Sequence, residues 1–337
     1  MITTSVSPRQ PSPSWQQQLA EAFVEPQALL RHLDLDPELG LRGSAFPMRV
    51  PRSYADRMRR GDRNDPLLLQ VLPQRKELQE VAGFNVDPVG ERSARRAPGL
   101  LQKYRGRALL LTTSACAVHC RYCFRREFPY QDHSDDAGRW HEALATFAAD
   151  SSLSELILSG GDPWALGNSR LTALSESLQD IAQLRRLRIH TRLPIVLPAR
   201  VDAGLLRWIA TLPWRVTVVV HSNHPNEINA CVTAALKSLA AHGATVLNQS
   251  VLLRGINDDA STLAALSDAL FEAGVLPYYL HLLDPVAGSA HFDVPEATGR
   301  RLIAQLAAEL PGYLVPRLVR EQAGAPAKTL IAAGHAG

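Results

Sequence analysis

The sequence predicts an α/β fold, a partial (βα)6 barrel preceded by an N-terminal helical extension. Two observations carry this prediction. From residue 108 onward, short apolar runs alternate with helical patterns at intervals of roughly 30 residues, the length of a βα unit. The first hundred residues lack this alternation and show capped helical patterns instead. We therefore expect an extension with its connector over residues 1–100 and a barrel over residues 101–337.

The extension begins with two helix signals. Ser14 can cap a helix that continues toward Phe23, and Pro26 can open a second helix, so we expect residues 14–100 to be mostly helical. An arginine-rich stretch follows. We interpret it as a solvated helix face rather than a nucleic-acid patch, because acidic residues are mixed into it; its members are Arg57, Arg59, Arg60 and Arg63.

Six runs rich in Leu, Ile and Val are the predicted strands of the barrel. They cover residues 108–113, 155–159, 187–191, 216–221, 245–250 and 278–282, and helical spacing covers residues 139–149, 171–184, 227–242 and 261–273. Continuous apolar strands predict a parallel sheet covered on both faces. In such barrels the reactive groups lie beyond the C-terminal ends of the strands, where the polar motifs of this sequence fall.

Composition excludes several classes of protein. The 337 residues are 46% hydrophobic and 20% charged, which describes a packed globular chain rather than a disordered one. Apolar runs stay well short of the ~20 residues that span a bilayer. Residues 1–14 lack a signal-peptide pattern, so we expect a cytoplasmic protein. A net charge of +3 spread among acids predicts no nucleic-acid partner, and we expect no membrane partner either.

Three of the four cysteines follow the first strand directly, as Cys116, Cys120 and Cys123. Disulfides between such close neighbours would be strained, and a cytoplasmic compartment disfavours them. Three thiolates at this spacing suit a [4Fe–4S] cluster that keeps one iron without a protein ligand. Zinc is the alternative, with His119 as a fourth ligand, although structural zinc sites usually combine separated ligand pairs. We expect Cys231 to be a buried core residue.

Polar groups also follow the next four strands. Gly160 and Gly161 allow the backbone to approach a ligand, and the carboxylate of Asp162 can accept from an ammonium group. The other strand ends carry side chains that are either ligands or satisfied polar groups on the barrel rim, namely Arg192, His221, Asn223, Asn248 and Gln249.

The CxxxCxxC segment on the first loop of a (βα)6 run resembles that of the radical S-adenosylmethionine enzymes. The resemblance implies that S-adenosylmethionine chelates the open iron and that one-electron reduction yields a 5′-deoxyadenosyl radical. Tyr122 matches the aromatic residue beside the last cysteine of that family. The resemblance also implies a set of residues that bind S-adenosylmethionine: Gly160, Gly161, Asp162, Arg192, His221, Asn223 and Gln249.

Longer stretches resemble the lysine 2,3-aminomutases, a branch of those enzymes, over roughly residues 80–330. The similar segments are 158–162, 192–200, 221–227 and 248–258. That family uses pyridoxal 5′-phosphate, which needs a lysine amine. The resemblance assigns this role to Lys328, although the glycine run before it is interrupted and Leu330 replaces a proline. An exposed C-terminal lysine is the alternative. The resemblance further implies Arg107 and Tyr104 at the cofactor phosphate, where Lys103 could join them, and His281 near the pyridoxal ring, in the place of a tyrosine.

The substrate residues are implied in the same way. Arg125 matches the arginine that pairs with the substrate carboxylate, and its planar fork suits that task. Asp284 and Glu321 match the two acids that hold the distal ammonium of lysine. In the clostridial type the second acid is an aspartate, so the longer Glu321 can shift where the ammonium is held. Surface salt bridges are the alternative for both acids.

The implied activity is the isomerisation of L-α-lysine to (R)-β-lysine through a bridging radical delocalised by pyridoxal. The priming electron would come from a reduced flavodoxin or ferredoxin. The short tail after Lys328, the helical opening over residues 15–33 and the segment 278–284 resemble the branch associated with elongation factor P, whose product a lysyl ligase attaches to that factor. Alternatives are a metabolic lysine or glutamate 2,3-aminomutase, and an iron–sulfur protein without catalysis.

Overall fold

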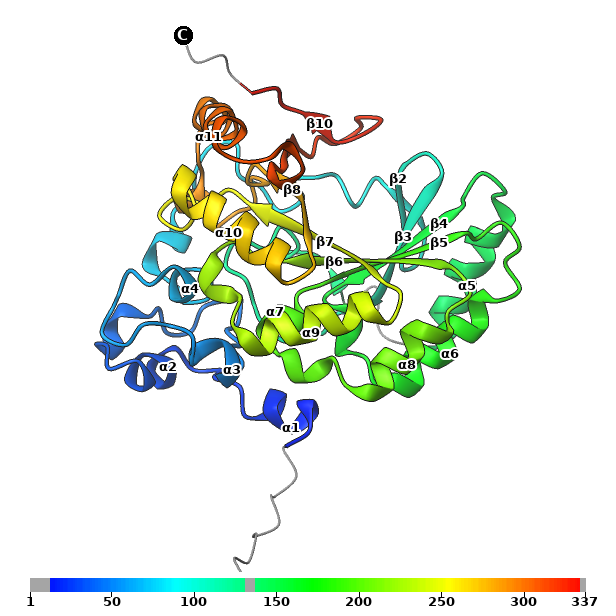
Figure 1. Ribbon diagram of the computed structural model, residues 1–337, viewed down its shortest axis with the longest axis horizontal. Helices are drawn as coiled ribbons and strands as arrows, with labels where there is room; N and C mark the ends of the chain where they lie inside the picture. Colours follow the sequence, from blue (N-terminus) through cyan, green and yellow to red (C-terminus); the bar gives the residue numbers. More distant parts are fainter. Residues whose placement is uncertain (1–12, 131–136, 334–337) are drawn as a thin grey trace, which may run out of the picture.

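The computed structural model describes residues 13–130 and 137–333. Its framework is a ten-stranded sheet whose spatial order follows the sequence order, from β1 to β10 (Figure 1). The central strands run parallel to one another and correspond to the six predicted strands, with small shifts at their ends. They are β3 Arg107–Thr113, β4 Glu155–Gly160, β5 Arg186–Thr191, β6 Arg215–His221, β7 Thr245–Val251 and β8 Leu276–His281.

Four further strands extend the sheet at its two edges. β1 Arg95–Ala97 and β2 Leu100–Tyr104 form antiparallel pairs before β3. At the other edge, β9 Arg317–Arg320 runs parallel to β8, and β10 Thr329–Leu330 pairs antiparallel with β9. Because the order is linear, with β1 and β10 as the outer strands, the predicted partial barrel is confirmed. A domain boundary at residue 100 stays a prediction, and it falls at the start of β2.

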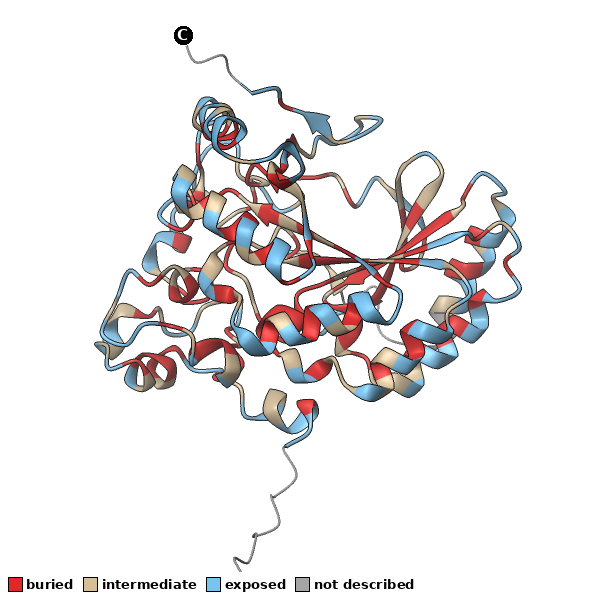
Figure 2. Ribbon diagram, viewed as in Figure 1, coloured by how far each residue is buried: buried red, intermediate tan, exposed pale blue. Residues whose placement is uncertain are grey.

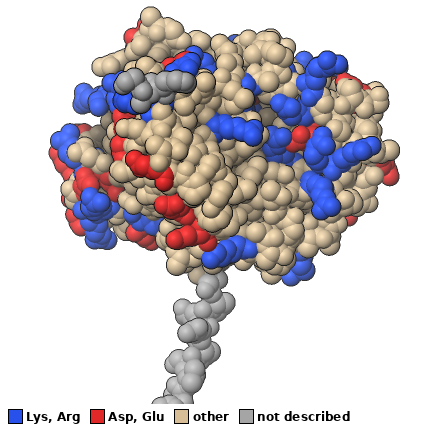
Figure 3. All heavy atoms as spheres, turned by 45° about the horizontal axis from the view of Figure 1, so that its top comes forward, with Lys and Arg blue, Asp and Glu red and all other residues tan. Residues whose placement is uncertain are grey.

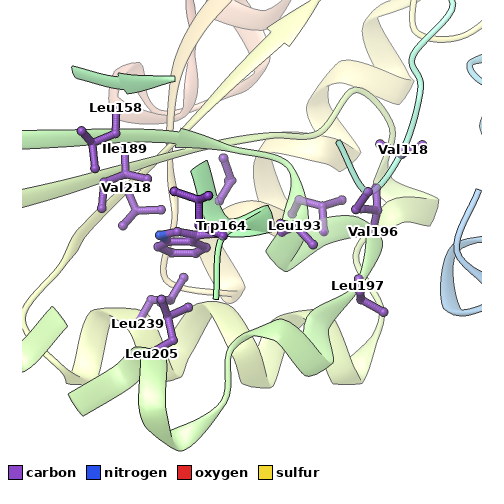
Figure 4. Close-up of a cluster of buried hydrophobic side chains, with 14 of the residues drawn as sticks. Val118, Leu158, Trp164, Ile189, Leu193, Val196, Leu197, Leu205, Val218 and Leu239 are labelled. Atoms are coloured by element: carbon purple, nitrogen blue, oxygen red, sulfur yellow. The ribbon is translucent and has the colours of Figure 1, made fainter. Parts of the chain in front are cut away.

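Helices cover the outer face of the sheet. Figure 1 shows α6 to α9 side by side along it, and Figure 4 shows Trp164 between the strands and the side chains of Leu205 and Leu239 on α8 and α9. The outer helices are α5 Ala137–Ala149, α6 Asn168–Leu178, α7 Leu193–Val196, α8 Ala203–Thr211, α9 Ala230–Ala241, α10 Ala260–Glu272 and α11 Glu296–Glu309. Short 3-10 helices are η1 Pro37–Leu39, η2 Arg75–Leu78, η4 Pro163–Ala165, η5 Pro198–Arg200, η6 Pro225–Glu227, η7 Ala290–Phe292 and η8 Gly312–Leu314.

The inner face of the sheet differs from the outer face. Figure 2 shows buried residues along the strands and on the helix faces turned toward them. In β5 and β7, however, every second residue is only half-buried, including His190 and Gln249. The prediction of a sheet covered on both faces is therefore wrong for these strands. Arg188 and His190 on β5 and Gln249 on β7 are polar because this face lines the candidate site rather than a helix layer, whereas Leu247 and Val251 on the same face of β7 are apolar.

The N-terminal extension is less helical than predicted. Ser14 caps the first helix through a capping box with Gln17, and Pro26 opens the second, as expected. The helices α1 Trp15–Ala20, α2 Pro26–His32, α3 Arg52–Ala55 and α4 Pro66–Leu69 are short, and irregular segments separate them. Prolines open α2 and α4 and also lie between α2 and α3, so a helix cannot run through these points. Leu29 and Leu30 belong to the same hydrophobic cluster as the barrel core, so the extension packs on the barrel.

Two predictions about single residues are wrong. Arg57 does not lie on a solvated face, because its guanidinium donates to the carbonyls of Ser53, Ile195 and Glu227. Arg59, Arg60 and Arg63 are exposed, as expected. Cys231 is exposed rather than buried, because it precedes Val232 on α9 and so falls outside the face of that helix that packs on the sheet.

The surface shows how the charges are distributed. In Figure 3 the Lys and Arg side chains form several separate groups, with acidic side chains between some of them. Within residues 13–130 and 137–333, no helix is both long and apolar enough to cross a bilayer. Residues 1–12, which make up most of the segment behind the cytoplasmic prediction, lie outside the described residues.

Candidate active site

The loop after β3 holds three half-buried cysteines with free thiols, Cys116, Cys120 and Cys123. Burial raises the pKa of Cys116 well above its usual range and that of Cys123 to about 11, and the neighbouring cysteines act in the same direction. Three thiolates that repel one another need a cationic partner among them, which iron supplies. Arg192 already contributes positive charge, because its Nη1 donates to Cys120 Sγ at 2.7 Å.

His119 does not face these thiols. Its Nδ1 donates to the carbonyl of Pro47 at 3.0 Å, and its ring lies 5.3 Å from that of Phe46. Zinc therefore loses the fourth ligand that the sequence offered. Among the described residues, no three or more His, Cys, Asp or Glu side chains gather around one point. A cluster binds its cysteines through different iron atoms, so it needs no such convergence.

The Gly160–Gly161 turn lies against the strand that leads into the cysteine loop. The amide of Gly161 donates to the carbonyl of Thr113 at 2.7 Å, and the amide of Asp162 to that of Ala115 at 2.8 Å. Gly160 has a φ of +121°, and a Cβ there would approach the Thr113 oxygen to 2.5 Å; a Cβ on Gly161 would collide with the Ala115 carbonyl. Only glycine fits both positions, which leaves backbone rather than side chains facing the cysteine loop.

The carboxylate of Asp162 is hydrogen-bonded to other groups of the protein. It accepts from Thr191 Oγ1 at 2.7 Å and from the amides of Trp164, Arg192 and Leu193 at 3.0, 2.7 and 3.2 Å. Burial raises the pKa of Asp162 to about 6, while these donors oppose the rise. The side chain therefore ties the turn after β4 to the end of β5, and it positions Gly160 and Gly161.

A buried polar network lies behind Cys120. Arg192 Nη2 donates to Glu227 Oε2 at 2.9 Å and to Gln70 Oε1 at 2.7 Å. Asn223 Nδ2 donates to Tyr122 Oη at 2.7 Å and to Gln70 Oε1 at 3.0 Å. The Tyr122 hydroxyl lies 3.1 Å from His221 Nε2, and the two rings stack with centroids 5.7 Å apart. Gln70 comes from the extension, so that segment completes this wall of the site.

A second group of charges lies around Lys328, just before β10. Its ammonium pairs with Glu321, and Lys103 Nζ lies 3.2 Å from the other oxygen of the same carboxylate. Burial raises the pKa of Glu321, but these two ammonium groups lower it more strongly, to about 2. Burial raises the pKa of Asp284 to about 7, and Lys328 opposes that rise. On β2 and β3, the guanidinium of Arg107 lies 4.6 Å from the Tyr104 ring centroid.

Arg125 is buried and already paired. Its Nε and Nη2 each donate to Glu91 at 2.7 Å, and its Nη1 donates to Ser159 Oγ at 2.8 Å and to the Gly160 carbonyl at 3.1 Å. Glu91 also lies 3.9 Å from Lys103. Arg125 therefore connects the glycine turn beside the cysteine loop to the charges around Lys328.

Comparison of the whole chain with known proteins shows which family it is similar to. Residues 104–187, which include all three clustered cysteines, match the family described as "4Fe-4S single cluster domain". The chain is 47% identical to an L-lysine 2,3-aminomutase of Escherichia coli over 94% of this chain and 93% of that protein. It is 44% identical to that of Haemophilus influenzae, over 95% and 96%. This chain belongs to the L-lysine 2,3-aminomutase family.

Two further similarities are more distant. The L-lysine 2,3-aminomutase of Clostridium subterminale is 34% identical over 84% of this chain and 68% of that protein. Among solved structures, a radical SAM methyltransferase from Sphaerobacter thermophilus aligns with a TM-score of 0.47 and 16% identity, over 66% of this chain and 68% of that one.

In this chain the predicted residues fall into the two groups described above. The group around the cysteine loop contains Cys116, Cys120, Cys123, Gly160, Gly161, Asp162, Arg192, His221 and Asn223. The group around Lys328 contains Lys328 itself, Glu321, Asp284, Tyr104, Arg107 and His281, and Arg125 lies toward it. Gln249 lies between them on β7, opposite His221 of β6 and Tyr279 of β8. Their binding roles stay predictions.

Three residues of the candidate site were not predicted from the sequence. They are Glu91, Gln70 and His190. Among the described residues, the Nε2 atoms of both His190 and His281 are buried without a hydrogen-bond partner. Burial lowers the pKa of both rings, and nearby positive charges, including Lys328, lower it further. The alternating pattern of β5 could have placed His190 on the inner face. Nothing local marks Glu91 or Gln70.

Proposed function

We propose that this protein isomerises L-α-lysine to (R)-β-lysine with a [4Fe–4S] cluster, S-adenosylmethionine and pyridoxal 5′-phosphate. The observation that carries the proposal is the similarity to L-lysine 2,3-aminomutases over nearly the whole chain. The charges support it, because a lysine substrate has a carboxylate at one end and an ammonium at the other. Arg125 suits the first, and Glu321 with Asp284 suits the second.

The protein residues fit the groups that this chemistry needs. The cluster with S-adenosylmethionine supplies a carbon radical, and pyridoxal phosphate carries the migrating amine. Cys116, Cys120 and Cys123 offer the thiolates, and the absence of side chains at Gly160 and Gly161 lets this turn pack directly against the backbone that leads into the cysteine loop. Lys328 offers the amine, and Arg107 offers a cation for a phosphate.

The residues around Lys328 bind ammonium groups. Because Glu321 stays ionised down to a pH of about 2, it holds an ammonium group at every physiological pH. Lys328 must leave Glu321 before its amine can react with a carbonyl, since only the unprotonated amine is a nucleophile. A substrate ammonium can then pair with the carboxylate of Glu321.

The proposal includes the use of the product. We infer that (R)-β-lysine supplies a lysyl ligase that modifies elongation factor P, and that reduced flavodoxin or ferredoxin provides the priming electron in the cytoplasm. The resemblance of the N-terminal opening and of residues 278–284 to that branch supports this assignment.

A product assay tests the proposal. Protein reconstituted anaerobically with iron and sulfide is incubated with S-adenosylmethionine, pyridoxal phosphate, dithionite and lysine, and β-lysine is measured by mass spectrometry. We expect β-lysine from lysine and no β-glutamate from glutamate. Turnover of glutamate alone would favour a glutamate aminomutase. An intact cluster with neither product would favour an iron–sulfur protein without catalysis.

The Lys328→Ala variant tests the cofactor assignment. It is expected to lose the pyridoxal absorption band and β-lysine formation together, because Lys103, the other amine on Glu321, is held between Glu321 and Glu91. Lys237→Ala, an exposed change on α9, is the matched control and should retain both. A Lys328→Ala protein that keeps the band and the activity would remove the assignment.

A further inference from the structure

Charged side chains form a continuous chain of alternating sign through the candidate site. It runs from Arg125 to Glu91 at 2.7 Å, from Glu91 to Lys103 at 3.9 Å, from Lys103 to Glu321 at 3.2 Å, and from Glu321 to Lys328. The two ends are the residue proposed for the substrate carboxylate and the lysine proposed for the cofactor. Of the three members between them, Glu321 already has a role in the proposed function, whereas Glu91 and Lys103 have none.

Glu91 holds Arg125 as a substrate carboxylate would. Its two oxygens accept from Nε and Nη2 in a bidentate pair, and the side chain of Glu91 is only 3% exposed. The Nη1 group of Arg125 is committed to Ser159 and Gly160. A second carboxylate can form the same bidentate pair only if Glu91 moves away.

Lys103 is the partner to which Glu91 can move. A buried carboxylate without a counter-charge is costly, so Glu91 can leave Arg125 only toward another cation. Lys103 lies at 3.9 Å, beyond good hydrogen-bonding distance but within reach of a side-chain rotation. Lys103 is also bonded to Glu321, so a shift of Lys103 toward Glu91 frees an oxygen of Glu321.

The backbone around Glu91 connects it to the Lys328 segment. Asp87 accepts from the amides of Glu91 and Arg92 at 2.8 and 3.2 Å, which fixes the turn. Gly90, with a φ of +66°, lies so close to Ala323 that a Cβ there would be 2.9 Å from the Ala323 Cβ. The turn at Gly90 therefore directly contacts the segment between Glu321 and Lys328.

We propose that Glu91 is a positioning residue that occupies Arg125 until the substrate carboxylate arrives, and that it then transfers to Lys103. Resting on the proposed function, this exchange explains how one substrate engages both ends of the site. Displacement of Glu91 draws Lys103 away from Glu321, and Glu321 then receives the distal ammonium. A molecule that carries only one of the two charges completes only part of the exchange.

Equilibrium binding tests the exchange without turnover. Protein loaded with cluster and pyridoxal phosphate, with S-adenosylmethionine omitted, is titrated by calorimetry with lysine and with lysinamide, which lacks the carboxylate. The wild type should bind lysine at least about tenfold more tightly than lysinamide, as expected for a charge-assisted bidentate pair. Equal affinities for the two would overturn the exchange, while β-lysine formation in the product assay would still uphold the proposed function.

Variants of Glu91 and Lys103 distinguish positioning from simple structural support. Lys103→Met should weaken lysine binding about tenfold, because Glu91 loses its second partner, whereas Lys103→Arg should stay within about threefold of the wild type. Adding Glu91→Gln to Lys103→Met should restore lysine affinity, since the neutral amide no longer competes for Arg125. Lys237→Met is the matched surface control. A double variant that binds no better than Lys103→Met would overturn the proposal.

Discussion

Asp284 shows, at the scale of a single residue, what burial among charges does to a carboxyl group. Burial raises its pKa to about 7, and the negative charges of Glu321 and Glu91 add to this rise. Lys328 and Lys103 oppose it without cancelling it. Asp284 therefore changes its charge close to neutral pH, whereas Glu321 beside it stays ionised.

This difference predicts a pH-dependent stability. The folded chain keeps the proton on Asp284 up to a pH of about 7, while the unfolded chain releases it near its ordinary value of 3.8. The folded state thus binds more protons in this window, so the contribution of Asp284 to stability is lost as the pH rises toward 7. Asp284→Asn removes the titrating group, and its stability relative to the wild type should rise between about pH 5 and about pH 8.

Urea unfolding of the two proteins at both pH values measures the effect. Asp268→Asn, an exposed change on α10, is the control and should show little difference between them. A stability gap between Asp284→Asn and the wild type that does not change with pH would contradict the assignment of the raised pKa.

Single site residues could be predicted only where a local pattern marked them. Cys116, Cys120 and Cys123 stand at a cluster spacing, and Gly160 and Gly161 end a strand. Glu91 and Gln70 could not be predicted in this way, because their roles depend on partners far along the chain. Gln70 accepts hydrogen bonds from Arg192 and Asn223, and only the folded chain brings these residues close to it.

The same limit applies at the scale of elements. The central strands were predicted well because each is a long apolar run that must be buried. The edge strands β1 and β10 were not predicted, since they are short and carry exposed residues, so pairing with a neighbour rather than hydrophobic pattern defines them. The extension was predicted too helical, because its capping signals mark where helices begin but not how soon they end.

Arg57 on the extension provides a test at this scale. Its guanidinium links the end of α3 to the carbonyls of Ile195 and Glu227 on the barrel, so Arg57→Met leaves half-buried carbonyls without donors. Charge-assisted hydrogen bonds of this kind contribute about 1.5–3 kcal/mol each, and we expect a loss of about 2–4 kcal/mol in the free energy of unfolding. Urea unfolding measures it.

A matched arginine serves as the control. Arg60→Met removes a solvent-exposed pair with Asp34 and should change stability little. Equal losses for Arg57→Met and Arg60→Met would show that the contacts of Arg57 do not hold the extension on the barrel.

At the scale of the whole molecule, one carboxylate joins the parts that surround the cysteine loop. Glu227 is fully buried and accepts from Arg192 Nη2, from Gln70 Nε2 and from the amides of Asn223 and His224. Through Arg192 this network reaches Cys120, and through Gln70 it reaches the extension. The extension, the ends of β5 and β6, and the cysteine loop should therefore lose order together.

Glu227→Gln tests this coupling with almost no change in volume. Arg192 would remain buried without its counter-charge, which costs about 3–5 kcal/mol when a buried pair is broken from one side. We expect a loss of that size in urea unfolding, together with a lower iron content after reconstitution, because Arg192 would no longer be held against Cys120. Glu38→Gln, in an exposed pair with Arg42, should change neither quantity. A Glu227→Gln protein that loses stability but retains its full iron content would separate the network from the cysteine loop, since destabilisation alone does not require Arg192 to move.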